Sequence, residues 1–197
     1  MSLTLTILGC GSSGGVPRVG QGWGACDPND PRNRRRRCSI LLTRLGAEGS
    51  TQVLVDTSPD LRAQLLDVGL EHLDAILMTH PHADHTMGID DVRPLVLKAG
   101  HRIAMHMDAA TAKVVRHSFG YIFEAPPGSG YPPLLDDRRI EAGVEIDLEG
   151  PGGAIAARPF RVHHGEIDAL GYRFGDVAYT PDLNAIPDDS IDALANL

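Results

Sequence analysis

Cysteine is scarce in this chain of 197 residues. Three cysteines are present, Cys10, Cys26 and Cys38, and no two of them form a C-x-x-C pair. An odd number of widely spaced cysteines does not predict a disulfide framework, and it favours a reducing compartment.

Long apolar runs and basic charge are also lacking. No apolar run approaches the roughly 20 residues that cross a bilayer. The first residues, MSLTLTILG, have neither the basic region nor the apolar core of a secretory signal. The net charge of −8 argues against a general nucleic-acid-binding surface. These absences predict a soluble, cytoplasmic protein with neither a membrane nor a nucleic acid as its partner.

Aromatic residues make up only 5% of the sequence, so a core must be built from leucine, isoleucine, valine and alanine. Hydrophobic residues nevertheless account for 42%, which is typical of globular proteins. The length suits one well-filled domain over residues 1–197. A monomer and a homodimer both remain open at this stage.

The most informative stretch is residues 73–88, which read LDAILMTHPHADHTMG. Its first part, residues 73–78, is mostly apolar and predicts a buried strand. Four side chains that can bind metal then follow within six positions, namely His80, His82, Asp84 and His85. In an extended backbone the first three would share one side, and a turn would bring His85 towards a neighbouring point. The pattern predicts imidazole and carboxylate ligands for two adjacent cations.

Other polar residues stand at the ends of predicted strands. Asp56 ends a predicted strand over residues 51–56, His163-His164-Gly165 follows one over residues 154–162, and Asp182 follows one over residues 177–180. A helix is predicted from Ser58 as N-cap to Gly69, and its buried stripe should contain Leu61, Leu65, Leu66 and Val68. Residues 120–135 are expected to form a loop, either a lid or plain surface.

Two glycine- or arginine-rich segments lie near the N-terminus. Residues 9–17, GCGSSGGVP, form either a simple turn or a loop that lines a site. Residues 18–37 read RVGQGWGACDPNDPRNRRRR and predict a long irregular insertion. Its arginines are open to three interpretations: a solvated basic loop, phosphate capture, or a localisation signal. The candidates for phosphate capture are Arg34, Arg35, Arg36 and Arg37.

The segment THPHADHTMG resembles the T-H-x-H-x-D-H-x-x-G motif of the metallo-β-lactamase superfamily of metal-dependent hydrolases. Residues 8–17, 37–39, 164–165 and 170–172 resemble the phosphodiesterase branch that includes phosphoribosyl 1,2-cyclic phosphate phosphodiesterase. The likeness spans nearly the whole chain. It implies an α+β fold, a four-layer αββα sandwich with a metal site at one edge between the sheets.

The resemblance also implies a set of site residues. His164 is chosen over His163 because the family's ligand precedes a glycine. Asp56 would orient the site from behind the ligands. The implied ligands are His80, His82 and His164 for one ion, Asp84 and His85 for a second, and Asp182 as the bridge.

Two departures from the family pattern stand out. Some relatives hold a structural zinc through clustered cysteines in the early insertion, but Cys26 stands alone there, so no such zinc is predicted. The family also usually continues past the point where this chain ends, with a further histidine ligand and a histidine proposed as general acid. We therefore expect a C-terminally incomplete domain, either a fragment or a protein whose second metal site lacks a ligand.

The implied function is metal-dependent hydrolysis of a small cyclic or nucleotide-like phosphodiester. Two divalent ions, zinc or manganese with iron as another option, would share a hydroxide that attacks phosphorus. Asp84 would orient this nucleophile, and the arginines of residues 34–37 would offset phosphate charge. Alternatives on the same metal centre are a lactonase or thioesterase and a tRNA-processing nuclease. A further alternative, from a different functional class, is a metal-binding fragment without catalytic activity.

Overall fold

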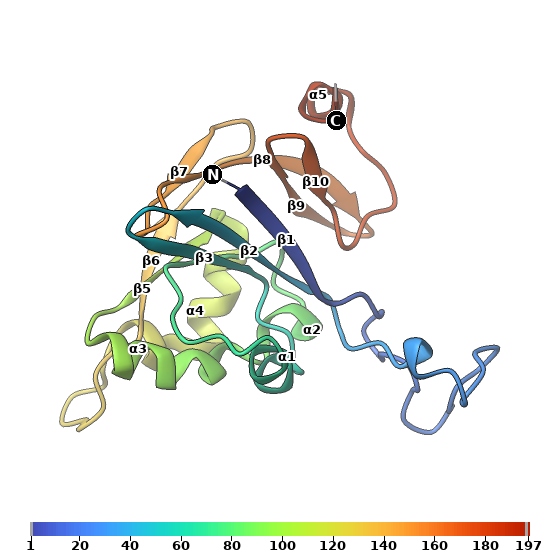
Figure 1. The fold of residues 1–197 in the computed structure, drawn as a ribbon, viewed down its shortest axis with the longest axis horizontal. Helices are drawn as coiled ribbons and strands as arrows, with labels where there is room; N and C mark the ends of the chain where they lie inside the picture. The colour runs from blue at the N-terminus through green and yellow to red at the C-terminus, as the bar shows by residue number, and fades with distance from the viewer. Residues whose placement is uncertain (1, 196) are drawn as a thin grey trace.

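The computed structural model describes residues 2–195 and 197. Its framework is a pair of β-sheets packed face to face, with helices on the outer side of each sheet (Figure 1). The larger sheet has six strands in the order β1-β2-β3-β4-β5-β6, and the smaller has four in the order β10-β9-β8-β7.

The larger sheet is antiparallel in its first half and parallel in its second half. The predicted strands over residues 51–56 and 73–78 are both present, as β3 and β4. The edge strand β6 was not predicted from the sequence, because its residues, LDDRR, are mostly charged. The strands are β1 (Ser2–Gly9), β2 (Ser39–Gly46), β3 (Gly49–Val55), β4 (Ala75–Leu77), β5 (Ile103–Met107) and β6 (Leu135–Arg139).

Helices α1, α3 and α4 cover the outer face of the larger sheet, and their buried apolar side chains pack against those of its strands. Asp108 caps α4, with Oδ1 accepting a hydrogen bond from the Thr111 amide at 2.7 Å. The elements of this layer are α1 (Leu61–Asp67), α2 (Ala83–Thr86), the 3-10 helix η2 (Ile89–Val92), α3 (Arg93–Ala99) and α4 (Ala109–Phe123).

The smaller sheet is antiparallel throughout. Its inner face packs on the larger sheet, and Tyr172 of β9 and Ile40 of β2 belong to the same buried cluster. Its outer face carries Phe160 and Val162, which Ala193 of the C-terminal segment covers. The elements are β7 (Ile146–Leu148), β8 (Ile155–His164), β9 (Ile167–Phe174), β10 (Val177–Tyr179), α5 (Asp188–Ile191) and the 3-10 helix η3 (Asp192–Leu194).

The order of layers is therefore helices, sheet, sheet, helix, which confirms the predicted α+β fold with an αββα sandwich. Within the described residues, no helix is both long and apolar enough to cross a membrane.

Two local predictions were wrong. The first helix begins at Leu61 with Asp60 in the N-cap position, rather than directly after Ser58. The Ser58 hydroxyl accepts from the Asp60 amide at 3.2 Å and donates to the Gln64 side chain at 2.8 Å, so it stabilises the turn before the helix. Leu66 and Val68 are exposed, whereas the polar Gln64 is buried. The expected loop over residues 120–135 is shorter at its start, because α4 continues to Phe123.

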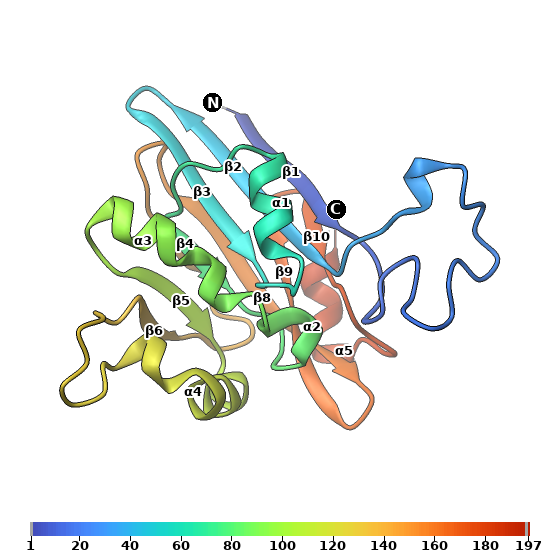
Figure 2. The same cartoon turned by 90° about the horizontal axis from the view of Figure 1, so that it is seen from below.

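The insertion over residues 18–37 projects from the body as an extended loop, as both views show (Figures 1 and 2). Its regular structure is the short 3-10 helix η1 (Pro31–Asn33), which Asp30 caps. The prediction of a mostly irregular insertion is confirmed.

Two hydrogen bonds join the sheets at the point where β4 leaves the larger one. The buried Tyr172 hydroxyl donates to the Met78 carbonyl at 2.6 Å. The Leu170 amide of β9 donates to the Thr79 carbonyl at 2.8 Å. These bonds hold the loop after β4 against the edge of both sheets.

Candidate metal centre

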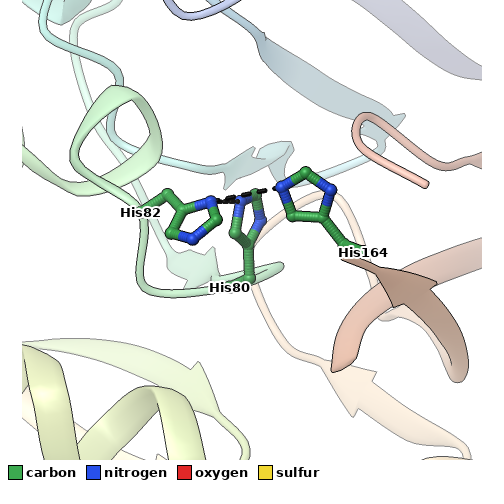
Figure 3. A group of neighbouring side chains, drawn as sticks. All are labelled: His80, His82 and His164. Carbon is green, nitrogen blue, oxygen red and sulfur yellow. Dashed lines mark hydrogen bonds between the residues drawn. The ribbon is translucent and has the colours of Figure 1, made fainter. Parts of the chain in front are cut away.

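The loop after β4 delivers the first histidines to the edge between the sheets. His80 directly follows Thr79 and is fully buried, and His82 lies in the N-cap position of α2. The end of β8 brings His164 to the same place from the smaller sheet. Figure 3 shows the three imidazole rings turned towards one another.

Nitrogen atoms of these three rings lie within direct contact distance. His82 Nδ1 is 3.1 Å from His80 Nε2 and 3.2 Å from His164 Nε2 (Figure 3). Two donor atoms bound to one zinc ion at about 2.0–2.1 Å lie roughly 3.3–3.4 Å apart in tetrahedral geometry. The spacing of the three nitrogens therefore fits a single cation.

A second group of ligand atoms adjoins the first. His85 Nε2 lies 3.5 Å from Asp84 Oδ2 and 3.4 Å from Asp182 Oδ2. The same Asp182 oxygen is 3.8 Å from His80 Nε2 and 3.6 Å from His164 Nε2. Asp182 thus stands between two ligand groups, the position that a bridging carboxylate occupies.

The environment of His85 tests whether the site suits a cation. Its Nε2 atom is buried and has no hydrogen-bond partner in the described part of the chain. A buried polar atom without a partner is costly, so its presence beside two carboxylates calls for a ligand. The donor set of imidazoles and carboxylates fits zinc, manganese or iron.

Asp56 lies behind the candidate ligands and forms hydrogen bonds that fix two of their neighbouring groups. It is fully buried, and its φ of 62° is left-handed, which is unusual for a residue other than glycine. Its carboxylate accepts hydrogen bonds from the Thr79 amide at 2.8 Å, the Thr79 hydroxyl at 2.8 Å and His85 Nδ1 at 2.7 Å. The bond from Nδ1 leaves Nε2 of His85 facing the metal site.

The same chain of hydrogen bonds orients His80. The Thr79 hydroxyl gives its proton to Asp56, so it accepts from His80 Nδ1, which lies 3.0 Å away. His80 therefore carries its proton on Nδ1 and presents the lone pair of Nε2 to the cluster. One buried carboxylate selects the tautomer of two histidines.

The pKa values of the two buried histidines, His80 and His85, shift in opposite directions. Burial, together with the neighbouring His85 and His82 rings, lowers the pKa of His80 to about 3. Burial also acts against the charged form of His85, but the carboxylates of Asp56, Asp182 and Asp84 outweigh it and raise its pKa to about 10. The His85 ring, whose Nε2 lies 3.4 Å from Asp182 Oδ2, in turn lowers the pKa of Asp182. A cation at His85 Nε2 would take the place of that proton.

The structure brings all six predicted ligand residues to this edge, and Asp56 lies directly behind them. His163 points elsewhere, because its Nδ1 pairs with Asp168 at 2.8 Å on the exposed side of β8. The roles of these residues as ligands remain predictions.

The arginine run is dispersed rather than gathered at the site. Arg34 lies over the Trp23 ring, and Arg36 pairs with Asp67 at 2.8 Å. Arg35 contacts Cys26 and Asn33 within the insertion. Arg37 is different, since it pairs with Asp60 at 3.1 Å and lines a cavity of about 540 Å³ that reaches Asp84.

Sequence reasoning missed three residues that line the site. Ser12 and Ser13 line a cavity of about 340 Å³ together with His82, Asp84 and His164. Arg18 lines the adjoining cavity with Arg37, and its guanidinium donates to the Ser12 hydroxyl at 2.7 Å. The available signal was the glycine-rich loop over residues 9–17, which was left open between a turn and a site lining.

Comparison with known proteins agrees with this architecture. The model of the family described as "Beta-lactamase superfamily domain" matches residues 51–197. The crystal structure of a diphosphatase from the PhnP family is 38% identical with a TM-score of 0.83, and the match covers all of this chain and 72% of that one. Zn²⁺-bound PqqB from Methylobacterium extorquens has a TM-score of 0.66 at 19% identity, over 98% of this chain and 69% of that one, and so shows the fold alone.

Curated relatives match over part of their own length. Octanoyltransferase of Porphyromonas gingivalis is 33% identical over 189 residues, which is 95% of this chain but 36% of that protein. Ribonuclease Z of a Bradyrhizobium species is 28% identical over 131 residues, which is 64% of this chain and 41% of the relative. Taken with the family model and the PhnP-family structure, these matches show that the chain belongs to the metallo-β-lactamase superfamily of hydrolases, in its PhnP-like branch.

Proposed function

We propose that this chain is a phosphodiesterase that hydrolyses a small cyclic or nucleotide-like phosphodiester at a two-cation site. The observation that carries the proposal is the position of Asp182 Oδ2, which lies 3.4–3.8 Å from nitrogens of His85, His164 and His80. A carboxylate oxygen placed between two ligand groups suits a pair of cations better than a single one. His80, His82 and His164 would hold one ion, Asp84 and His85 the other.

Divalent ions in such a site lower the pKa of water and take up charge on phosphoryl oxygens. The chain's own groups supply position and proton transfer. Asp84 both contacts His85 Nε2 and lines the cavity, so its carboxylate is placed to orient an attacking water and to accept its proton. Thr79 and Asp56 fix the rings of His80 and His85, which keeps the ligand atoms from rotating away.

The surroundings of the site favour an anionic substrate. Arg18 and Arg37 line the cavity that continues from Asp84, and the Ser13 side of the glycine loop borders both cavities. Guanidinium groups form stronger, charge-assisted hydrogen bonds with phosphate oxygens than with the carbonyl oxygen of a neutral lactone or thioester. The cavity volumes of about 340 and 540 Å³ suit a small molecule.

The diphosphatase named among the similar structures supports phosphoryl chemistry in this branch. Its name concerns a phosphoanhydride rather than a phosphodiester. Both bonds are cleaved by attack on phosphorus, so a diphosphate ester belongs in the test as a second substrate.

The test measures hydrolysis of bis(4-nitrophenyl) phosphate by the full chain with added Mn²⁺ or Zn²⁺. Turnover that disappears in Asp84→Asn and persists in His163→Ala is the expected result, because His163 faces Asp168 outside the site. Turnover of a lactone or thioester without turnover of the phosphodiester would refute the proposal. Faster cleavage of a diphosphate ester than of the phosphodiester would instead indicate that the substrate is a phosphoanhydride.

Two further measurements separate the remaining alternatives. A non-catalytic module would bind one ion per chain and hydrolyse none of these esters. A tRNA-processing nuclease would bind tRNA with a strong dependence on salt, because phosphate contacts release counterions. For a small-molecule phosphodiesterase we expect two ions per chain and no tRNA binding.

A further inference from the structure

A third cavity adjoins the two that border Asp84. It has a volume of about 270 Å³, and its lining includes Arg18, Gln21 and Trp23. Arg18 and Gln21 also line the cavity of about 540 Å³ that reaches Asp84. That cavity in turn shares Ser13 and Asp84 with the cavity of about 340 Å³ beside the candidate ligands. The three cavities therefore form a row that begins at the candidate metal centre and ends at Trp23.

Backbone hydrogen bonds fix the position of Trp23 at the far end of this row. The Arg18 amide donates to the Gly22 carbonyl at 2.8 Å, and the Gly22 amide donates to the Arg18 carbonyl at 2.8 Å. Val16 and Arg35 exchange a second pair of bonds, at 2.9 and 3.0 Å, which joins the start of the insertion to its end. Because Trp23 directly follows the closed turn over residues 18–22, the backbone sets its place relative to the cavities.

The side chain of Trp23 is partly exposed, and its neighbours in the chain leave it room. Gly22 and Gly24 flank it with left-handed φ values of 68° and 58°, and a Cβ at either glycine would meet no atom within 4 Å. Arg34 lies over the indole ring, with its guanidinium carbon 5.4 Å from the ring centroid. A partly exposed aromatic ring that lines a cavity offers a stacking surface to a planar group.

Positive charge lies between Trp23 and the candidate metal centre. The Arg18 guanidinium donates to the Ser12 hydroxyl at 2.7 Å, and it pairs with no carboxylate in the described part of the chain. Arg37 lines the same middle cavity as Arg18. Residues 18–37 hold six arginines and two aspartates, although the whole chain has a net charge of −8. An arginine without an acidic partner at a cavity suits a phosphate group.

We propose that this row of cavities binds a nucleotide, with its base on Trp23 and its phosphate between Arg18 and Asp84. The role of the nucleotide as substrate rests on the proposed function, whereas its binding does not. The inference narrows the substrate class, because a cyclic sugar phosphate without a base would leave the Trp23 cavity empty. Stacking on an aromatic ring accepts any base, so no preference among bases is expected.

The binding test uses the fluorescence of Trp23, which is the only tryptophan in the chain. The full-length protein, without added metal, is titrated with thymidine 5′-monophosphate, thymidine and inorganic phosphate. The nucleotide should quench the fluorescence to saturation and should bind about 10-fold or more tightly than thymidine, since its phosphate bonds to a charged group. Inorganic phosphate should leave the fluorescence unchanged. Equal quenching by inorganic phosphate, or no saturable quenching by the nucleotide, would overturn the proposal.

Turnover in variants separates base stacking from other contacts. Trp23→Ala should raise the KM for thymidine 5′-(4-nitrophenyl phosphate) about 5-fold or more, which corresponds to the loss of one stacked base. The KM for methyl 4-nitrophenyl phosphate, which has the same leaving group but no base, should not change. Trp23→Phe keeps an aromatic ring and should restore most of the affinity. An equal rise in KM for both substrates would overturn the proposal.

Tyr131→Ala is the matched control. Arg93 lies 5.9 Å from the Tyr131 ring centroid, much as Arg34 lies over Trp23, but Tyr131 is not among the described residues that line the row. This variant should keep both KM values and the quenching by nucleotide. Base-dependent quenching without turnover of any ester would support the nucleotide site and refute the proposed function. Turnover without any dependence on the base would support the proposed function and overturn this inference.

Discussion

Asp56 and His85 form a buried pair in which His85 Nδ1 lies 2.7 Å from Asp56 Oδ2. A nearly identical contact occurs outside the site, where His163 Nδ1 lies 2.8 Å from Asp168 Oδ1. The Asp56–His85 pair is buried, whereas the His163–Asp168 pair is exposed. The second pair therefore serves as a control for substitutions in the first.

Asp56→Asn should weaken metal binding by about 10–100-fold, as expected when a partner that orients a ligand is lost. Asparagine keeps the size of the side chain and tolerates the left-handed backbone at this position. Isothermal titration of the metal-free protein with Zn²⁺ measures the change. Asp168→Asn is the control and should bind as tightly as the unmodified protein. An equal loss of Zn²⁺ affinity in both variants would show that Asp56 does not orient a ligand.

Asp182→Ala should reduce the bound metal from two ions to one per chain. The reason is that Asp182 Oδ2 is the atom that lies near both ligand groups. Elemental analysis after gel filtration gives the stoichiometry. Asp176→Ala, in the turn between β9 and β10, should leave it unchanged. Retention of both ions in Asp182→Ala would argue against a bridging carboxylate.

Arg18→Ala should raise the KM for a phosphodiester about 10-fold or more, with a smaller change in kcat. A hydrogen bond to a charged group contributes roughly 1.5–3 kcal/mol, and Arg18 lines the cavity next to Asp84. Arg36→Ala provides the control, because Arg36 pairs with Asp67 away from that cavity. Steady-state kinetics would contradict the prediction if both variants behaved alike.

Gly88→Ala should destabilise the fold by about 2–4 kcal/mol, in the range of severe packing defects. An added Cβ would lie 2.0 Å from the Ser58 carbonyl oxygen. Because that oxygen belongs to the backbone, it cannot move away without distorting the chain. Gly120→Ala in α4 meets no atom within 4 Å and should be neutral or stabilising by up to about 1 kcal/mol. Urea denaturation of both variants measures the contrast.

Protonation of His106 should make the folded protein less stable in mild acid. Burial lowers its pKa to about 4, and the Arg138 charge adds to the effect, so the folded state holds His106 neutral while the unfolded state binds a proton below about pH 6.5. Stability should therefore fall as the pH drops from about 6.5 towards 4, and His106 should have no effect above that window. His106→Gln should show a shallower decline in urea denaturation at stepped pH. An unchanged slope would contradict the assignment.

The strands and the metal loop were predictable because their signals are local. An apolar run followed at once by His80, His82, Asp84 and His85 is read along a few residues. The expected extended run through Asp84 was wrong, because α2 begins at Ala83 and a helical turn, not alternation, positions Asp84 and His85. The prediction failed where tertiary contacts outweigh local preference. Ser58 is an ordinary N-cap candidate, yet its hydroxyl bonds both the Asp60 amide and the buried Gln64 side chain in a turn before the helix, which starts at Leu61.

The sequence by itself indicated the type of chemistry, since the nitrogen and oxygen donors in that loop would suit a small group of metals and the family resemblance pointed to His164 and Asp182. Only the tertiary structure decided which charges accompany the centre. Arg18 and Arg37 border its cavities, while Arg34 and Arg36 are engaged by Trp23 and Asp67. The physical reason is that ion pairs and stacking within a folded loop depend on distances between residues far apart in the chain, which composition and spacing do not encode.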